Sequence, residues 1–459
     1  MISRREFLAA TSATVAVSTV GGASTPQSRS GGEKSARLFL PEDDLKAANY
    51  DRLPMEWHKG RAKMLQEKLV EDGNDGILLT DRWNIIYFTG LWHTTTERPL
   101  QVFIPAKGND PVWFFAALDR NLVGTWWPGE REMYFDFPHG DGAFPNDGKV
   151  QMGARVDLAE WVFKALKKRG FSEKKLVADT ELTPSVQRKV VNILGREMGS
   201  AEDRCMSMRV HKSPEEQALT RRAYNYFNQM HAFARDMLLQ HGTDLTDFDI
   251  GSAATKYGVD LVMADIKRDG APHTAVGIEI EVACRVGRST AYPHPNQFLH
   301  NKITRGQALQ IEGGVHIAGC GGELYRPFFI HPLTEQMRKL WTVSRDCCLM
   351  QKEESIAGVT CSTVAYKIHK FQVKSGVAPY IYHRPAHGEG WEGHQKPYLS
   401  LGDYTMLEAG MAFSVEPGLY DPEHGIGSNF SDNFMVQPEG PARQMSRLPW
   451  SEEWCLVKL

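Results

Sequence analysis

From residue 55 onward, the apolar residues follow two periods. An apolar residue at every third or fourth position predicts helices over 55–71 and 158–168. Short apolar runs rich in branched and aromatic residues predict strands at 76–80, 84–88, 100–104 and 112–116. Alternating short strands and helices are typical of an α/β domain, which we place at residues 37–204.

A different pattern covers residues 205–459. Ser213, Pro214 and Glu216 form a capping box with proline in the first turn, so a long helix is predicted to run from there to about Leu239. Further helices are predicted at 247–257 and 334–354, among strands at 308–313, 328–331, 411–415 and 433–436. This mixture predicts a second domain of the α+β class.

The first 36 residues are predicted to be an export signal followed by a linker. Arg4 and Arg5 precede Phe7-Leu8 and a modestly apolar run that ends in small residues near Gly21. This arrangement resembles a bacterial twin-arginine signal, which a receptor reads and which anchors nothing in the membrane. We therefore expect a periplasmic or secreted protein without membrane attachment once the signal is removed.

The composition changes this picture little. A chain of 459 residues suits two or three domains, and a net charge of −3 offers no basic surplus for nucleic acid. Beyond the N-terminus, no apolar stretch is long enough to cross a bilayer. The seven cysteines show no C-x-x-C spacing, which favours buried thiols over a disulfide framework.

Five short segments of the second half combine histidines, carboxylates and glycines. They read Tyr-Pro-His-Pro at 292–295, Leu-Gln-Ile-Glu-Gly-Gly at 309–314, Gly-Cys-Gly-Gly-Glu-Leu-Tyr-Arg at 319–326, His-Gly-Glu-Gly-Trp-Glu-Gly-His at 387–394 and Ser-Val-Glu-Pro-Gly-Leu-Tyr at 414–420. Their order and spacing resemble the M24 pita-bread family, which includes creatinase, aminopeptidase P and prolidase. The first half is similar to that family's extra N-terminal domain. The resemblance implies an α/β N-terminal domain followed by an α+β pita-bread catalytic domain.

The resemblance also implies a metal site, but an altered one. Peptidases of the family bind two divalent ions through two Asp, one His and two Glu. The matching positions here are Glu312, Glu323, His387, Glu416 and Ser431, so one carboxylate has become a hydroxyl. Serine is a poor ligand for these cations. We therefore expect either no metal, or a single divalent ion held by Glu312, Glu323, His387 and Glu416.

Creatinase, the metal-free member of the family, suggests how such a site could work without an ion. His294 matches its base, and Arg98 falls where creatinase places an arginine that binds the substrate carboxylate in the partner subunit. That role would require a homodimer. Three converging carboxylates repel one another, and a cationic substrate group would relieve the repulsion. The likeness is incomplete because Tyr325 stands where creatinase has a pocket glutamate.

These observations leave three functions open. The first is an exported hydrolase of the creatinase/Xaa-Pro peptidase type that cleaves a C–N bond in a small carboxylate-bearing substrate, with or without a metal. The second is a metal-dependent Xaa-Pro aminopeptidase or dipeptidase, and the third is a non-catalytic pita-bread binding protein. The candidate catalytic residues are His294, Glu323, His387 and Glu416, and the candidate substrate-binding residues are Arg98, Glu312 and His394.

Overall fold

The computed structural model describes residues 52–93, 96–108, 110–124, 129–135, 151–152, 156–265, 277–294 and 300–459. The predicted export signal and linker lie outside these residues. All described residues fall within one structural unit, Leu38–Leu459. Within the described helices, none combines the length and the apolar character needed to cross a membrane.

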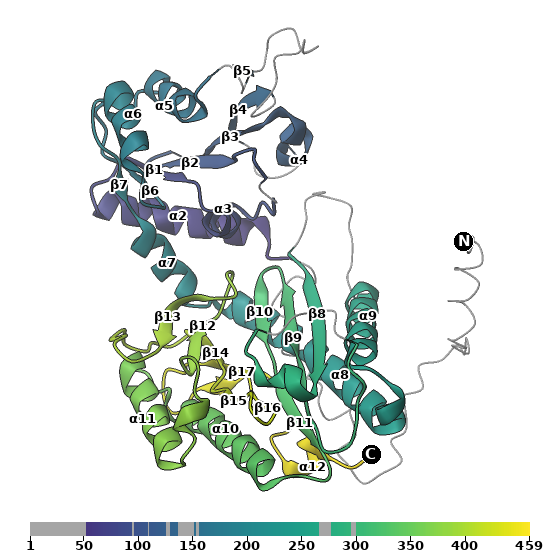
Figure 1. Cartoon of the computed structure of the whole chain (residues 1–459). Helices are drawn as coiled ribbons and strands as arrows, with labels where there is room; N and C mark the ends of the chain where they lie inside the picture. The colour runs from purple at the N-terminus through teal and green to yellow at the C-terminus, as the bar shows by residue number, and fades with distance from the viewer. Residues whose placement is uncertain are drawn as a thin grey trace, which may run out of the picture. The chain divides into compact units, whose positions relative to one another are not determined.

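The N-terminal half is built on a seven-stranded mixed sheet with the strand order β5-β4-β3-β2-β1-β6-β7 (Figure 1). Its strands are β1 (Gly76–Leu79), β2 (Gln101–Pro105), β3 (Val112–Ala116), β4 (Glu130–Phe135), β5 (Gln151–Met152), β6 (Leu176–Ala178) and β7 (Gly199–Ser200). Its helices are α2 (Met55–Glu71), α3 (Arg82–Thr89), α4 (Arg120–Gly124), α5 (Leu158–Lys168) and α6 (Pro184–Leu194). The predicted α/β class of this half is confirmed.

The predicted strand at 84–88 is wrong, because α3 covers this segment as a helix. Asp81 caps the helix by accepting a hydrogen bond from the backbone N–H of Asn84, and Gly90 ends it in the left-handed conformation with φ 75°. Every residue from Asn84 to Thr89 is buried. An apolar run that is buried on all sides lacks the polar face that would distinguish a helix from a strand.

Two helices lead into the C-terminal half. Helix α7 (Glu202–Val210) runs across the domain boundary that the sequence predicts at 204–205. Helix α8 (Pro214–His241) begins with the predicted capping box, in which Ser213 and Glu216 bond each other's backbone N–H groups. Helix α9 (Asp247–Asp265) starts where predicted and continues beyond residue 257.

Two five-stranded sheets and a two-stranded sheet of β15 (Leu419–Asp421) and β16 (Ile426–Ser428) are found among the described residues of the C-terminal half. The first has the order β10-β9-β11-β19, with β8 on the other edge of β9, and the second has the order β13-β12-β14-β17-β18 (Figure 1). The first comprises β8 (Glu279–Val286), β9 (Ala308–Ile317), β10 (Cys320–Glu323), β11 (Arg326–Ile330) and β19 (Leu456–Val457). The second comprises β12 (Ala386–Gly388), β13 (Gln395–Leu399), β14 (Ala412–Val415), β17 (Asp432–Met435) and β18 (Arg443–Gln444). Of these strands the sequence analysis predicted β9, β11, β14 and β17, and it missed the others.

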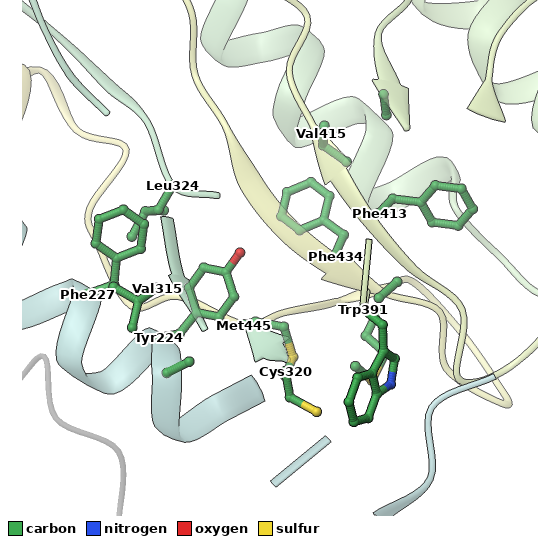
Figure 2. Packing of buried hydrophobic residues seen from close by; sticks show 14 of the residues in the cluster. Tyr224, Phe227, Val315, Cys320, Leu324, Trp391, Phe413, Val415, Phe434 and Met445 are labelled. Carbon is green, nitrogen blue, oxygen red and sulfur yellow. The ribbon is translucent and has the colours of Figure 1, made fainter. Parts of the chain in front are cut away.

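Helices and a shared core fix these sheets. Helix α8 packs on β9 and β10, and α11 (Cys361–Lys374) packs on α10 (Glu335–Glu354) and β13. Figure 2 shows Tyr224 and Phe227 of α8 beside Val315 and Leu324, in one cluster with side chains of the second sheet. All seven cysteines are free thiols, and six are buried, as predicted. The α+β prediction for this half is also confirmed.

Candidate active site

A cavity of about 850 Å³ lies where the two five-stranded sheets of the C-terminal half meet. Five of the predicted site residues line it, namely His294, Glu312, Glu323, His394 and Glu416. His387 contacts two of these carboxylates from a fully buried position on β12. Six of the seven candidate site residues are therefore brought together at this cavity, and Arg98 of the N-terminal half is the exception.

His387 presents an unsatisfied nitrogen to two carboxylates. Its Nδ1 lies 3.1 Å from the carbonyl oxygen of Gly388, which can only accept, so Nδ1 carries a proton. Its Nε2 lies 3.4 Å from Glu416 Oε1 and 3.7 Å from Glu323 Oε2. This buried Nε2 has no hydrogen-bond partner among the described residues. When the imidazole is neutral, Nε2 carries the lone pair, so that one nitrogen and two carboxylates surround a point where a cation could replace the Nε2 proton.

His394 completes this cluster from the loop that follows β12. Its ring stacks on that of His387 with centroids 3.7 Å apart and planes 14° from parallel. Its Nε2 lies 3.8 Å from Glu323 Oε1. One ligating atom from each of Glu323, His387 and His394 lies within 4.8 Å of the others. These three side chains can therefore contact one metal ion together.

The surroundings of His387, Glu416 and Glu323 shift the pKa values of these side chains in different directions. Burial lowers the pKa of His387, but the neighbouring carboxylates of Glu323, Glu389 and Glu416 outweigh it and raise the pKa to about 9. Burial, with help from Glu323, raises the pKa of Glu416 to about 7. Burial also raises the pKa of Glu323, but His387 and His394 lower it by more, so that it falls below its usual range. Glu416 is thus suited to exchange protons near neutral pH.

Glu312 faces a different partner, Arg285, which the sequence analysis missed. Arg285 donates from Nε at 2.9 Å and from Nη2 at 2.6 Å to the same oxygen, Oε2 of Glu312. Its Nη1 donates to the carbonyl oxygens of Ser289 and Tyr292. On neighbouring strands, Ala283 stands opposite Glu312, and its small side chain leaves room for the diagonal contact. Arg285 thus neutralises the carboxylate that the resemblance assigns to the metal.

The position that lost its carboxylate is occupied by a pair of hydroxyls. Ser431 Oγ lies 3.2 Å from Ser414 Oγ, which also donates to Glu323 Oε2 at 3.2 Å. The neighbouring Asp432 does not replace it, since it points away and pairs with the buried Arg326 at 2.7 Å. This follows from the alternation of side chains along a strand.

Two of the predicted residues lie at the margin. His294 is exposed and lines the cavity two residues after Tyr292, whose carbonyl Arg285 holds. Arg98 of the N-terminal half pairs with Glu97 and does not line the cavity of its own chain. Its predicted contact with a partner subunit stays a prediction.

Two further charged residues belong to the site region and were not predicted to do so. Arg384, three residues before His387, lines the cavity. Glu389 is 1% exposed, and neither of its carboxylate oxygens has a hydrogen-bond partner among the described residues. Burial, with help from Glu323, raises the pKa of Glu389 well above its usual range. The only sequence signal for these two residues is the His-Gly-x-Gly segment, which contains Glu389 and begins three residues after Arg384.

These contacts decide how many metal ions the residues fit. The orphaned Nε2 of His387, together with Glu323 and His394, fits one divalent ion. A second ion would need Glu312 and residue 431, but Arg285 already binds Glu312 and Ser431 offers only a hydroxyl. The paired metal centre implied by the resemblance therefore does not fit, whereas a single ion does.

Comparison with known proteins agrees with this fold. Residues 217–438 match the model of metallopeptidase family M24. A putative dipeptidase, YkvY of Bacillus subtilis, is 23% identical over 388 residues, covering 83% of this chain and 96% of its own. The Xaa-Pro dipeptidase of Lactobacillus delbrueckii subsp. lactis is 24% identical over 372 residues, covering 78% and 89%.

A solved structure extends the likeness to both halves. The crystal structure of dipeptidase PepE from Mycobacterium ulcerans superposes with a TM-score of 0.70 at 20% identity, covering 89% of this chain and 100% of that one. At this identity the likeness shows the fold, in which an N-terminal domain precedes the pita-bread domain. The catalytic half thus matches metallopeptidase family M24, and the chain is similar over most of its length to hydrolases named as dipeptidases.

Proposed function

We propose that this protein hydrolyses short peptides as a dipeptidase of the Xaa-Pro type, with one divalent ion rather than two. The relatives named as dipeptidases support the substrate class. The observation that carries the single ion is the buried Nε2 of His387, which faces Glu323 and Glu416 and lies against His394. A buried polar atom without a partner is costly unless a ligand satisfies it.

In this proposal, Glu323, His387 and His394 hold the ion. The ion would polarise the scissile carbonyl and make a bound water more acidic. Glu416 would take a proton from the attacking water on a carboxylate oxygen and pass it to the departing nitrogen, because its pKa of about 7 allows both transfers at neutral pH. Ser414 orients Glu323 by donating to its Oε2.

A second candidate function is the metal-free cleavage of a small carboxylate-bearing substrate, of the creatinase type. The Arg285–Glu312 pair favours it, because a guanidinium here does the charge balancing that a metal ion would otherwise do. His294 at the margin of the cavity would then act as base, and Glu323 with Glu416 would hold a cationic group of the substrate. The retained carboxylates speak against a third candidate, a non-catalytic binding protein.

One experiment separates these functions. The protein is purified without an affinity metal, its metal content is measured by mass spectrometry, and alanyl-proline hydrolysis is assayed before and after chelation. About one bound equivalent of Mn, Zn, Co or Fe, with hydrolysis lost on chelation and restored by the ion, supports the dipeptidase. Hydrolysis of guanidino or ammonium carboxylates that resists chelation supports the creatinase type. Tight binding without turnover supports the binding protein.

We also propose that the protein is exported by the twin-arginine route and works as a homodimer in which Arg98 reaches the partner's cavity. Paired Arg4 and Arg5 before Phe7-Leu8 support the first part. Replacing both arginines by lysine should keep the protein in the cytoplasm, as cell fractionation would show. Light scattering tests the dimer, and a monomer with full activity would exclude the role in trans of Arg98.

A further inference from the structure

Among the described residues, two arginines line the cavity, and only one of them has hydrogen-bond partners there. Every interaction of Arg285 is with Glu312 or with backbone carbonyls of the following loop. Arg384, by contrast, donates no hydrogen bond to any described residue and has no carboxylate within 4.0 Å there, and its Nε is buried without a partner. A partly buried guanidinium without a counter-ion is unfavourable, so an anion in the cavity would stabilise it.

The fold holds Arg384 in this position. Its guanidinium carbon lies 4.4 Å above the ring of Tyr398, which stands opposite His387 in the β12–β13 pair. The preceding His383 fixes the backbone, because its Nδ1 donates to the carbonyl oxygen of Arg384 at 2.8 Å while its Nε2 bonds the hydroxyl of Tyr420 at 3.0 Å. Stacking leaves the edge of a guanidinium free to bind a carboxylate through two hydrogen bonds.

The cavity therefore has a negatively charged site and a separate positively charged site. Glu323 and Glu416 supply negative charge beside His387, and Arg384 supplies positive charge close enough to lower the pKa of Glu416. Arg285 is already neutralised and adds little. A substrate with one carboxylate, and with a cationic or metal-bound group a few bonds away, would match this arrangement.

We propose that Arg384 binds the terminal carboxylate of the substrate, so that the enzyme prefers dipeptides and similar short molecules with a free carboxylate over amidated or longer chains. The proposal rests on the proposed peptidase function and specifies its substrates. It assigns carboxylate binding to the same chain, whereas Arg98 would have to act from a partner. Arg384 then sets specificity mainly through substrate binding, since the carboxylate is remote from the scissile bond.

The test compares a free carboxylate with its amide. KM is measured for alanyl-proline and alanyl-prolinamide in the wild type, in Arg384→Gln and in Arg384→Lys. The control is Arg345→Gln, which removes an arginine of α10 that also stacks on an aromatic ring, Trp341, but does not line the cavity. We expect Arg384→Gln to raise KM for alanyl-proline at least tenfold and to change KM for the amide less than twofold. Arg384→Lys should recover part of the loss, and the control should change neither value.

Equal effects on both peptides, or no effect on either, would overturn the assignment. So would an Arg98→Gln variant that shows the carboxylate-specific loss while Arg384→Gln does not. If the wild type hydrolyses neither peptide, the proposed function fails, but calorimetric binding of L-proline and L-prolinamide still tests Arg384. Selective binding of L-proline that Arg384→Gln abolishes would support the carboxylate site, and equal binding by both proteins would refute it. Circular dichroism confirms that each variant is folded.

Discussion

The two sides of the cavity use the same kinds of residues in opposite ways. On the paired side, formed by β8 and β9, Arg285 and Glu312 satisfy each other. On the open side, formed around β12, the buried Nε2 of His387 and the buried Nε of Arg384 find no hydrogen-bond partner among the described residues. Charge alone therefore does not mark a binding site. Groups that the fold positions and leaves unsatisfied are the ones available to a ligand or an ion.

The largest effect is expected on the open side, at Glu416. Glu416→Gln should lower kcat by about 10²–10⁴-fold, because an amide cannot accept the proton from the attacking water. The wild-type rate should fall as the pH drops below about 7, where Glu416 becomes protonated. Steady-state kinetics from pH 5 to pH 9 would check both, and an active Glu416→Gln enzyme with an unchanged profile would remove Glu416 from the mechanism.

The two carboxylates that the first sheet contributes, Glu323 and Glu312, should differ almost as sharply. Glu323→Gln should weaken Mn²⁺ binding by at least about 10²-fold, since it removes a ligand, whereas Glu312→Gln should change it only a few fold because Arg285 already occupies Glu312. Isothermal calorimetry on metal-free protein gives both values. Equal losses would mean that Glu312 is a ligand after all and that the two sides are alike.

Stability should respond on the paired side instead. Arg285→Met should lower the free energy of unfolding by about 2–4 kcal/mol, because it leaves the mostly buried Glu312 carboxylate without its partner. The double variant with Glu312→Gln should recover much of this loss. The control is Arg338→Met, which breaks an exposed pair with Glu452 and should cost less than about 1 kcal/mol. Urea unfolding measures both losses. If Arg285→Met cost no more than the control, the comparison between the two sides of the cavity would be weakened.

The smallest effect is expected at Ser414, which supports Glu323. Ser414→Ala removes the hydrogen bond to Glu323 Oε2 and should weaken ion binding by about tenfold without changing the number of ions bound. Native mass spectrometry measures the number and calorimetry the affinity. A variant that loses the ion entirely would show that the hydroxyl itself is a ligand.

The elements that the sequence predicted are mainly those whose ends are encoded locally. The capping box at Ser213 and the periodic helix at 55–71 depend only on neighbouring residues, and both are confirmed. The error at 84–88 arose because that segment is buried on all sides and its apolar run has no polar face to reveal a helix. Local sequence patterns thus predict where elements begin and end, but they do not show which segments are buried on all sides.

Only the site residues that lie within recognised motifs could be predicted from the sequence. His387, His394, Glu323 and Glu416 come together as their motifs imply. Arg285 could not be found in this way, because its contact with Glu312 depends on the register of β8 against β9. The stacking of Arg384 on Tyr398 likewise depends on the β12–β13 register, which shifts between His387 and Gly388. A single-residue change of register would reverse the faces of these side chains.

The hydroxyl pair of Ser414 and Ser431 has a consequence for how the proposed metal ion would be supplied. Affinity for divalent ions rises with the number of charged ligands. An ion held by one carboxylate and two imidazoles should therefore be released and replaced more readily than an ion shared among four carboxylates. The fraction of active molecules would then follow the concentration of free ion in the surroundings, so that metal supply outside the protein, rather than its folding, would set how much of it is at work.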